Sequence, residues 1–486
     1  MSILSKDKRI IYSRKIKGFW EEYSRNKIGL VGLIGLLTFV FMALLAPWLT
    51  PYDPLQTTRL AEGFAMPEWV SIFPQYQDLP RTTENDVYWD LLNVSQGSMQ
   101  LVDALPGREL EVQYNGASEF LKTDVYFTSP TYTYPYQPPY SFNFAFRMTA
   151  ENVRDVRYNV EIFLISTTGA KWRIWPYRPW SQHVPAGEDK SLLVHSESSD
   201  YWLNVAVGLD AGVENLAEET FSEKGDYRLL LHMNFSPEAD RASCKIIIED
   251  TRFVIPGLLH GILGTDNVGG DILSQIIYGA RISLAIGLLA AAVSTLLGIL
   301  IGIMAGYMGG VVDEITMRIV DILLCLPVLP LLLALVFLFG KSVWYIVLLI
   351  AVFGWQGLSR LVRSLVLSLR ETAFIECARA SGASRFYIMT KHLVPNVLPV
   401  AFASMVLSVP GAILTEASLS FLGFGDPSSP TWGRMLQQAF GFGAFKALAW
   451  WWIIPPGLAL TGLCLSFVFM GHAVDEVINP RLRMRR

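Results

Sequence analysis

The chain has 486 residues, of which 52% are hydrophobic and only 17% are charged, and its mean hydropathy is +0.35. An ordinary soluble chain carries nearer a quarter charged residues, so this composition indicates a membrane protein with a large polar part. The net charge of −4 conceals a division: residues 55–260 hold 16 Lys and Arg against 28 Asp and Glu, and the remainder holds 23 against 15. The acidic region argues against a nucleic-acid partner.

The first apolar run covers residues 28–49 and contains no charged residue. Its length fits the ~20 residues that a helix needs to cross a bilayer. The preceding basic segment, 1–27, contains eight Lys and Arg, which places it in the cytoplasm. The run is too long for a signal peptide and no small-residue cleavage site follows, so we expect a retained transmembrane helix.

Residues 55–260 have a strand-like pattern. Polar and apolar residues alternate over 157–166 and 244–250, and turn signals such as Thr168-Gly169 separate the segments. Length and spacing favour one mainly-β domain, with a sandwich as the nearest architecture. The four cysteines lie far apart and only Cys244 falls in this region, so neither a disulfide nor a zinc site is expected.

Four aromatic residues crowd together in a predicted loop of this domain: Trp172, Trp175, Tyr177 and Trp180. Rings of this kind stack on sugars and peptides or contact a protein partner. Packing beneath an edge of the domain is the simpler interpretation, and contact with a partner or substrate is the alternative.

Five further apolar runs follow, at residues 282–307, 315–339, 343–366, 397–419 and 448–473. Six spans in total return the C-terminus to the cytoplasm, and the four arginines of the tail 481–486 agree with that side. We therefore expect an all-α polytopic membrane protein of six transmembrane helices, with its core in 261–480 and an extracytoplasmic mainly-β insert.

Small and polar residues within these spans predict helix contacts. Gly298, Gly302 and Gly306 recur at every fourth position, and Gly29, Gly32 and Gly35 at every third, so we expect close helix packing at both faces. Asp321 lies less than one turn beyond Arg318, which predicts an ion pair at a helix end. Glu416 either lines a translocation path or anchors a re-entrant stretch, and the sequence leaves both open.

A polar, basic segment at 371–395 separates two apolar runs. Its first part, up to Ser381, consists of helix formers, and Gly382 predicts a break. Ser384 is a suitable N-cap for a second short helix, which we expect to end before Pro395. Two short helices joined at a glycine beside the membrane would form a rigid knob for a soluble partner.

The pattern Glu376-x-Ala378-x-x-x-Gly382, followed by His392-Leu393-Val394-Pro395-Asn396, resembles the EAA loop of ABC importer permeases. Residues 19–54 and 261–480 are similar to the second, C-type permease of dipeptide, oligopeptide and nickel importers. The motifs are Gly264-Thr265-Asp266, Tyr278-Gly279-Ala280-Arg281 and Glu416-Ala417-Ser418-Leu419. The chain departs from the family pattern at Gly270, Gln275, Cys377 and Arg434, and in the length of the 55–260 region.

The resemblance implies a type I ABC importer-like permease in the cell membrane. The implied partners are a second homologous permease, two cytoplasmic ATPases and an extracytoplasmic solute-binding protein, with lipid around the helices and no nucleic acid. It also implies that the loop 371–395 couples to an ATPase. The residues assigned to this coupling are Glu376, Ala378, Gly382, Ile388, His392 and Pro395.

No chemistry of its own is expected from this chain: no catalytic residue, metal site or cofactor. Gly340-Lys341-Ser342 mimics the end of a phosphate loop, but Leu335 stands where that loop requires glycine. ATP hydrolysis is therefore expected in partner chains.

Two other classes of protein account for part of the pattern. A secondary transporter should contain inverted repeats and intramembrane ion ligands, and neither is evident. A membrane-anchored receptor, whose insert recognises a ligand or partner, leaves the basic loop unexplained. The sequence does not decide among peptides, oligosaccharides and metal complexes as substrate, although no histidine cluster favours a metal.

Overall fold

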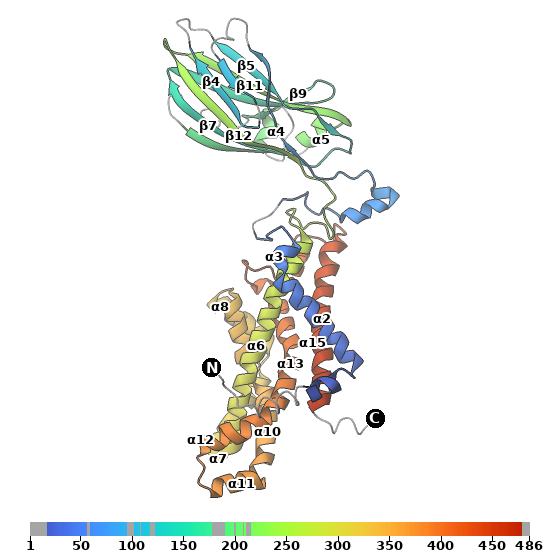
Figure 1. Cartoon of the computed structure of the whole chain (residues 1–486), viewed down its shortest axis with the longest axis vertical. Coiled ribbons are helices and arrows are strands. Elements are labelled where there is room, and N and C mark those ends of the chain that lie inside the picture. Colours follow the sequence, from blue (N-terminus) through green and yellow to red (C-terminus); the bar gives the residue numbers. More distant parts are fainter. Residues whose placement is uncertain are drawn as a thin grey trace. The chain divides into compact units, whose positions relative to one another are not determined.

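The computed structural model describes residues 17–55, 59–94, 102–106, 108–116, 122–176, 190–198, 201–207, 209 and 215–478. The chain forms two compact units (Figure 1): a helical unit of Met1–Thr58 and Asp271–Arg486, and a β unit of Arg59–Gly270. The β unit extends beyond the predicted boundary at 260 because its two chain ends pair. Arg59 N–H donates to Val268 O (3.1 Å) and Leu60 N–H donates to Gly269 O (2.9 Å).

The helical unit consists of long apolar helices with short ones between them. In chain order they are α2 (Lys27–Leu44), α3 (Ala46–Leu49), α6 (Ile272–Met308), α7 (Gly310–Cys325), α8 (Val328–Phe339), α9 (Val343–Val352), α10 (Gln356–Arg370), α11 (Ala373–Ala380), α12 (Arg385–Ile388), the π-helical turn η3 (Met389–Leu393), α13 (Val394–Leu419), the π-helical turn η4 (Ser420–Phe424), α14 (Trp432–Gly441) and α15 (Trp450–Ile478).

Within the described residues, five helical stretches are long and apolar enough to cross a membrane, and a sixth is added if α7 and α8 together form one span. These two helices meet at 89°, whereas one continuous span was predicted over 315–339. Pro327 explains the break, because its ring disfavours helical backbone at Leu326, which is extended with φ −73° and ψ 139°. The predicted class, a polytopic helical membrane protein with a mainly-β region, is confirmed.

The glycine faces pack as predicted. A Cβ atom at Gly302 would lie 2.6 Å from Ser359 O of α10, and one at Gly306 would lie 2.9 Å from Arg363 O. On α2, a Cβ atom at Gly32 would lie 2.7 Å from the backbone of Met470 in α15. Lipid supplies no hydrophobic drive between helices, so this close backbone approach is what the small residues permit.

The β unit is a sandwich of two six-stranded antiparallel sheets, ordered β10-β7-β12-β4-β3 with β1 on β12, and β2-β5-β11-β8-β9 with β6 on β11. The strands are β1 (Thr83–Asp86), β2 (Asp90–Val94), β3 (Val102–Leu105), β4 (Leu110–Asn115), β5 (Thr123–Thr128), β6 (Tyr132–Tyr134), β7 (Asn143–Arg154), β8 (Val156–Ile165), β9 (Lys171–Trp175), β10 (Lys190–Glu197), β11 (Gly225–Pro237) and β12 (Ser243–Ile255). Short helical pieces accompany them: η1 (Glu68–Ile72), η2 (Pro74–Tyr76), α4 (Tyr201–Ala206) and α5 (Leu216–Thr220).

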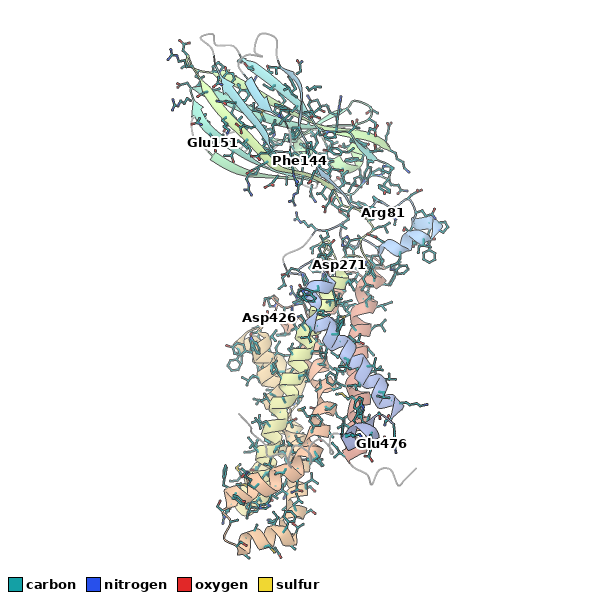
Figure 2. The ribbon with its side chains drawn as sticks, viewed as in Figure 1. Arg81, Phe144, Glu151, Asp271, Asp426 and Glu476 are labelled. Atoms are coloured by element: carbon teal, nitrogen blue, oxygen red, sulfur yellow. The ribbon has the colours of Figure 1, made fainter. Side chains whose placement is uncertain are left out.

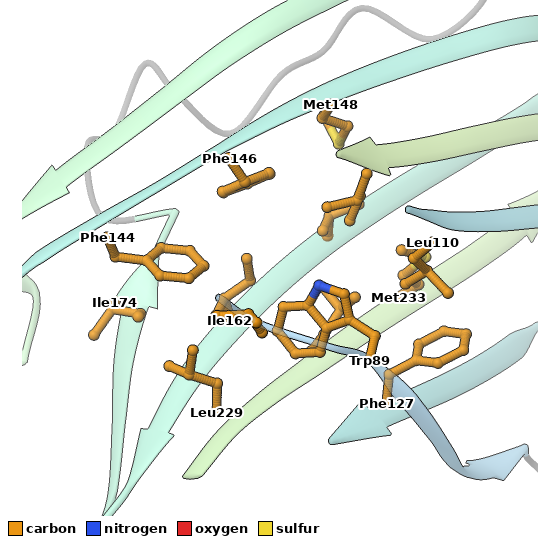
Figure 3. Packing of buried hydrophobic residues seen from close by; sticks show 14 of the residues in the cluster. Trp89, Leu110, Phe127, Phe144, Phe146, Met148, Ile162, Ile174, Leu229 and Met233 are labelled. Carbon is orange, nitrogen blue, oxygen red and sulfur yellow. The ribbon is translucent and has the colours of Figure 1, made fainter. Parts of the chain in front are cut away.

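One hydrophobic core fills the space between the two sheets (Figure 3). Trp89, Phe127 and Phe146 are completely buried in it. Along β5, Val125 and Phe127 face the core while Asp124 and Tyr126 are only partly buried, as the two-residue period of a strand requires. The β unit therefore has its own core, separate from the helical unit.

We predict that Gly302→Ala destabilises the helical unit, because the added Cβ meets backbone of α10 that cannot yield as a side-chain tip would. Overpacking of this kind typically costs about 1–3 kcal/mol. The matched control is Gly457→Ala in α15, where no atom lies within 4 Å of the added Cβ. This control should be neutral or slightly stabilising. The measurement is thermal unfolding of both purified variants, and equal melting temperatures would contradict the prediction.

Candidate functional site

The segment between α10 and α13 forms two short helices, α11 and α12, at one end of the helical unit (Figure 1). Gly382 separates them with φ +80°, a left-handed conformation that glycine adopts without strain. Ser384 caps α12, because its side chain accepts a hydrogen bond from Tyr387 N–H (3.2 Å). The predicted break and N-cap are therefore confirmed.

The predicted end of the second helix before Pro395 is wrong. Residues Arg385–Phe424 form one helical stretch through η3 and α13. Pro395 lies in the first turn of α13, where a missing N–H is tolerated, and the π-helical turn η3 comes immediately before it. The loop is thus joined to the long helix α13 without an interruption.

The loop is fixed to three long helices by apolar contacts. Ile375 of α11 and Ile388 of α12 are completely buried. They belong to a cluster with Ile299, Ile303 and Tyr307 of α6, Val362 and Val366 of α10, and Val397 and Ala401 of α13. The loop is therefore packed directly against all three helices.

The predicted coupling residues divide between the two sides of the loop. Glu376, Gly382 and Pro395 are exposed, whereas Ile388 is buried and Ala378 packs partly against the cluster. His392 is partly buried, with its ring 6.2 Å from Phe374 and 5.8 Å from Tyr387 between ring centroids. The structure brings these residues into one loop. Their role in coupling stays a prediction.

Sequence reasoning missed three aromatic residues on the exposed side of the loop. Phe374, Phe386 and Tyr387 are between 45% and 72% exposed. Large exposed apolar side chains next to exposed arginines, here Arg379 and Arg385, are typical of protein contact surfaces. The available signal was the presence of these aromatics inside an otherwise polar segment.

A groove of about 630 Å³ lies beside the loop, lined by Tyr307, Met308, Arg370, Glu371, Arg379, Ala383 and Arg385.

Ion pairs join α10 to α7. Arg363 forms a bidentate pair with Asp313 (2.5 and 2.6 Å), and Arg360 pairs with Asp321. Asp321 was predicted to pair with Arg318, but α10 lies close enough to supply Arg360 instead.

Glu416 is 2% exposed near the opposite end of α13. Its carboxylate accepts a hydrogen bond from Ser420 Oγ (2.6 Å) in η4. Of the two roles left open, this geometry fits an anchor for the turn between α13 and α14. A role in the translocation path stays a prediction.

Figure 2 places Asp426, which follows η4, at the same end of the helical unit as Asp271 and far from Glu476. Burial would raise the pKa of Asp426, but hydrogen bonds from Ser428 and Val343 hold it below its ordinary value.

A second surface missed from sequence is a groove among α6, α10 and α13. A cavity of about 240 Å³ is lined by Ser294, Thr295, Gly354, Gly357, Leu358, Leu361, Ser404 and Ser408. A neighbouring cavity of about 300 Å³ shares Ser294, Gly354 and Ser408 with it. It adds Gly411, Thr415 and seven apolar residues: Ala290, Ala291, Val328, Leu332, Ile350, Phe353 and Ala412. None of the residues lining either cavity is charged.

Hydroxyl groups give this groove its polarity. Thr295, which is 8% exposed, lines it together with Ser294, Ser404 and Ser408. Ser408 Oγ donates to Met405 O (2.8 Å), so its oxygen can still accept a hydrogen bond. The groove thus offers donors and acceptors without a charge.

Trp172 and Trp175 lie on strand β9 and not in a loop, as was predicted, and they pack against the core of the β unit. The Trp175 ring contacts Phe146 at 6.3 Å between centroids. Tyr177 and Trp180 lie outside the described residues, so contact of this aromatic group with a partner or solute stays a prediction.

Among the described residues, no group of three or more His, Cys, Asp or Glu side chains is placed to hold a metal ion.

Comparison with known proteins identifies the family. The model described as "Binding-protein-dependent transport system inner membrane component" matches residues 298–484, and the one described as "N-terminal TM domain of oligopeptide transport permease C" matches residues 16–67. Neither match includes residues 68–297, which contain most of the β unit.

Curated bacterial proteins are also similar to part of this chain. A putative peptide permease protein of Brucella suis is 36% identical over 222 residues, covering 46% of this chain and 73% of that protein. A putative peptide transport system permease protein of Brucella abortus is 36% identical over 234 residues, covering 48% and 77%. A probable peptide ABC transporter permease protein of Sinorhizobium fredii is 39% identical over 224 residues, covering 46% and 76%.

One solved structure, from a study of carbohydrate-binding modules of the β-sandwich superfamily, covers 40% of this chain and 63% of its own at 8% identity. Its TM-score of 0.18 is too low for any argument. The long apolar helices are those of a multi-pass membrane protein, and the family match makes it a transport protein. The chain belongs to the binding-protein-dependent transport system inner membrane component family, as a C-type permease subunit of an ABC transporter.

We predict that Ile388→Ala loosens the loop, because truncation of this buried side chain leaves a cavity in the cluster. Such a change typically costs about 2–5 kcal/mol. Hydrogen exchange of residues 373–393 should become faster, whereas Phe386→Ala, at an exposed position of the same loop, should leave it unchanged. Identical exchange in both variants would show that the cluster does not hold the loop.

Proposed function

We propose that this chain is the permease subunit of an ATP-driven importer of peptides or related solutes, including oligosaccharides. The printed names of the relatives support peptides as the first class to test. The observation that supports the mechanism best is the loop 371–395, whose buried isoleucines join it to α6, α10 and α13 while its other side is exposed.

In this proposal the exposed side of the loop fits into a cytoplasmic ATPase. Glu376, Gly382, His392 and Pro395 form the contact surface together with Phe374, Phe386 and Tyr387, while Ala378 and Ile388 hold the loop to the bundle. Two ATPases, a second homologous permease and a solute-binding protein complete the transporter. This chain supplies no cofactor and no catalytic residue, and ATP is hydrolysed in the partner chains.

The proposed topology follows from the distribution of charge. Both termini and the α11 end of the helical unit are cytoplasmic, because basic residues concentrate there. The β unit, inserted between α3 and α6, is then outside the cytoplasm. There it would dock or orient the solute-binding protein.

We further propose that the hydroxyl-lined groove is this chain's wall of the translocation path. Uncharged donors and acceptors on small residues can pair with the main-chain amides of a peptide without selecting for one side-chain charge. A solute that binds differently to the inward-open and outward-open states shifts their populations only as far as that difference in affinity allows.

The alternative, a membrane-anchored receptor whose insert recognises a ligand, is not favoured. It gives no role to the loop or to its apolar connection with three long helices. The family matches also cover the helical unit rather than most of the β unit.

The coupling role predicts that Glu376→Arg lowers solute-stimulated ATP hydrolysis and uptake by about tenfold, a typical size for a coupling free energy. Gly382→Pro should act likewise, because proline cannot adopt the φ of +80° found there. The assay uses proteoliposomes with the complete transporter. The control is Glu314→Arg, which makes the same change of charge at an exposed position of α7. Normal uptake by both loop variants would disprove the coupling role.

The proposal that the groove lines the translocation path predicts a different phenotype for Ser408→Leu. This substitution fills the groove with an apolar side chain. Uptake should fall severalfold while binding-protein-stimulated ATP hydrolysis persists, because the loop is untouched. Thr461→Leu in α15 is the control: its hydroxyl also donates to a backbone carbonyl of its own helix (Gly457 O, 2.8 Å) but lies outside the groove. Unchanged uptake by Ser408→Leu would remove the groove from the path.

A further inference from the structure

The β unit presents an exposed apolar patch outside its sandwich. We define the η1 patch as Trp69, Ile72, Phe73 and Ile262, whose exposed fractions lie between 43% and 74%. Trp69 and Ile72 are three residues apart on the 3₁₀-helix η1, so their side chains lie on the same side. Val70, on the opposite side, is buried.

Hydrogen bonds hold the patch in a defined shape. The Trp69 indole Nε1–H donates to Ile262 O (3.0 Å), which places these two members side by side. Glu68 N–H donates to Gly261 O (2.9 Å), and Gly261 N–H donates back to the Glu68 carboxylate (3.2 Å). The apolar side chains are therefore exposed on an ordered support and not on a frayed loop end.

The patch lacks the charges that a polar partner would recognise. Between Phe64 and Gln77 only Glu68 is charged, and no Asp, Glu, Lys or Arg occurs between Gly257 and Gly264. The indole N–H of Trp69 is already bonded within the chain, so its ring is available for apolar contact alone. Tryptophan with neighbouring aliphatic and aromatic residues is the composition found at the boundary between lipid and water.

The chain keeps the patch close to a membrane boundary. Ile262 precedes Asp271, the N-cap of α6, by nine residues, a contour length of at most ~30 Å even if fully extended. Two backbone turns shorten it further, since Gly264 N–H donates to His260 O and Asp266 N–H donates to Gly270 O. At this end of the helical unit, Trp48 is almost fully exposed and Thr50 is hydrogen-bonded to Ser274 of α6, which places the start of α6 at the level of an interfacial tryptophan.

We propose that the η1 patch rests in the headgroup layer of the membrane and fixes the base of the β unit to the lipid surface. The occupant is lipid, because the patch is continuous along the chain with a membrane-spanning helix, contains no charged residue among its four members and is held by hydrogen bonds.

The experiment uses the full-length chain in nanodiscs of phosphatidylcholine and phosphatidylglycerol. Ile72→Cys is labelled with a fluorophore in a background in which the four native cysteines are replaced by serine or alanine. The matched control is Leu92→Cys on β2, which is 54% exposed and equally apolar but lies on the sandwich. Lipids brominated near the headgroup and aqueous iodide serve as the two quenchers.

The proposal expects brominated lipid to quench the label at position 72 several times more strongly than the label at position 92, and iodide to do the reverse. Equal iodide quenching at both positions overturns it. So does a label at 72 that becomes shielded only when the solute-binding protein or the second permease is added, since the occupant would then be a protein.

A second measurement avoids substitutions altogether. A phospholipid with a photoreactive group next to its headgroup is incorporated around the unaltered chain, and adducts are located by mass spectrometry. Adducts on residues 68–76 together with adducts on the peptide that contains Trp48 support the proposal. Adducts at Trp48 without any on residues 68–76 overturn it.

Discussion

The close approach of α6 and α10 is the contact on which the rest of the helical unit depends. Gly298, Gly302 and Gly306 remove the side chains that would hold the two backbones apart. In lipid this packing must come from dispersion and fit, because no hydrophobic effect drives apolar helices together. Ile303 and Tyr307 extend the same face of α6 into the cluster that holds α11 and α12. One helix therefore connects the middle of the bundle to the loop.

The loop combines two properties that a coupling element needs. Its buried isoleucines make it part of the bundle, and its exposed aromatic and charged residues leave a surface for another protein. The continuous helical stretch from Arg385 to Phe424 adds a direct mechanical connection, because α13 ends at the turn anchored by Glu416. The same helix carries Ser404 and Ser408 of the hydroxyl-lined groove, so the proposed coupling loop and the proposed path share one helix.

Much of the architecture followed from sequence. Uninterrupted apolar runs predicted the spans, alternation predicted the strands of the β unit, and glycine spacing predicted the packed faces. Gly382 and Ser384 marked the loop helices because their conformational and capping preferences are local. The failures were non-local or cooperative: Pro327 divides the third predicted span, Pro395 is accommodated after a π-helical turn, and Asp321 pairs with Arg360 on a helix distant in sequence.

The sequence by itself determined the class of protein, the position of the loop and the separation into helical and β-rich parts, because hydropathy, periodicity and motif spacing act over short stretches of chain. Only the tertiary structure decided which side chains of the loop face outward, that Glu416 is buried against Ser420, and that serines and threonines of α6 and α13 share one groove beside α10. It also decided that Trp69, Ile72, Phe73 and Ile262 form one exposed patch. Burial and neighbourhood depend on how distant segments pack, and no local pattern specifies that.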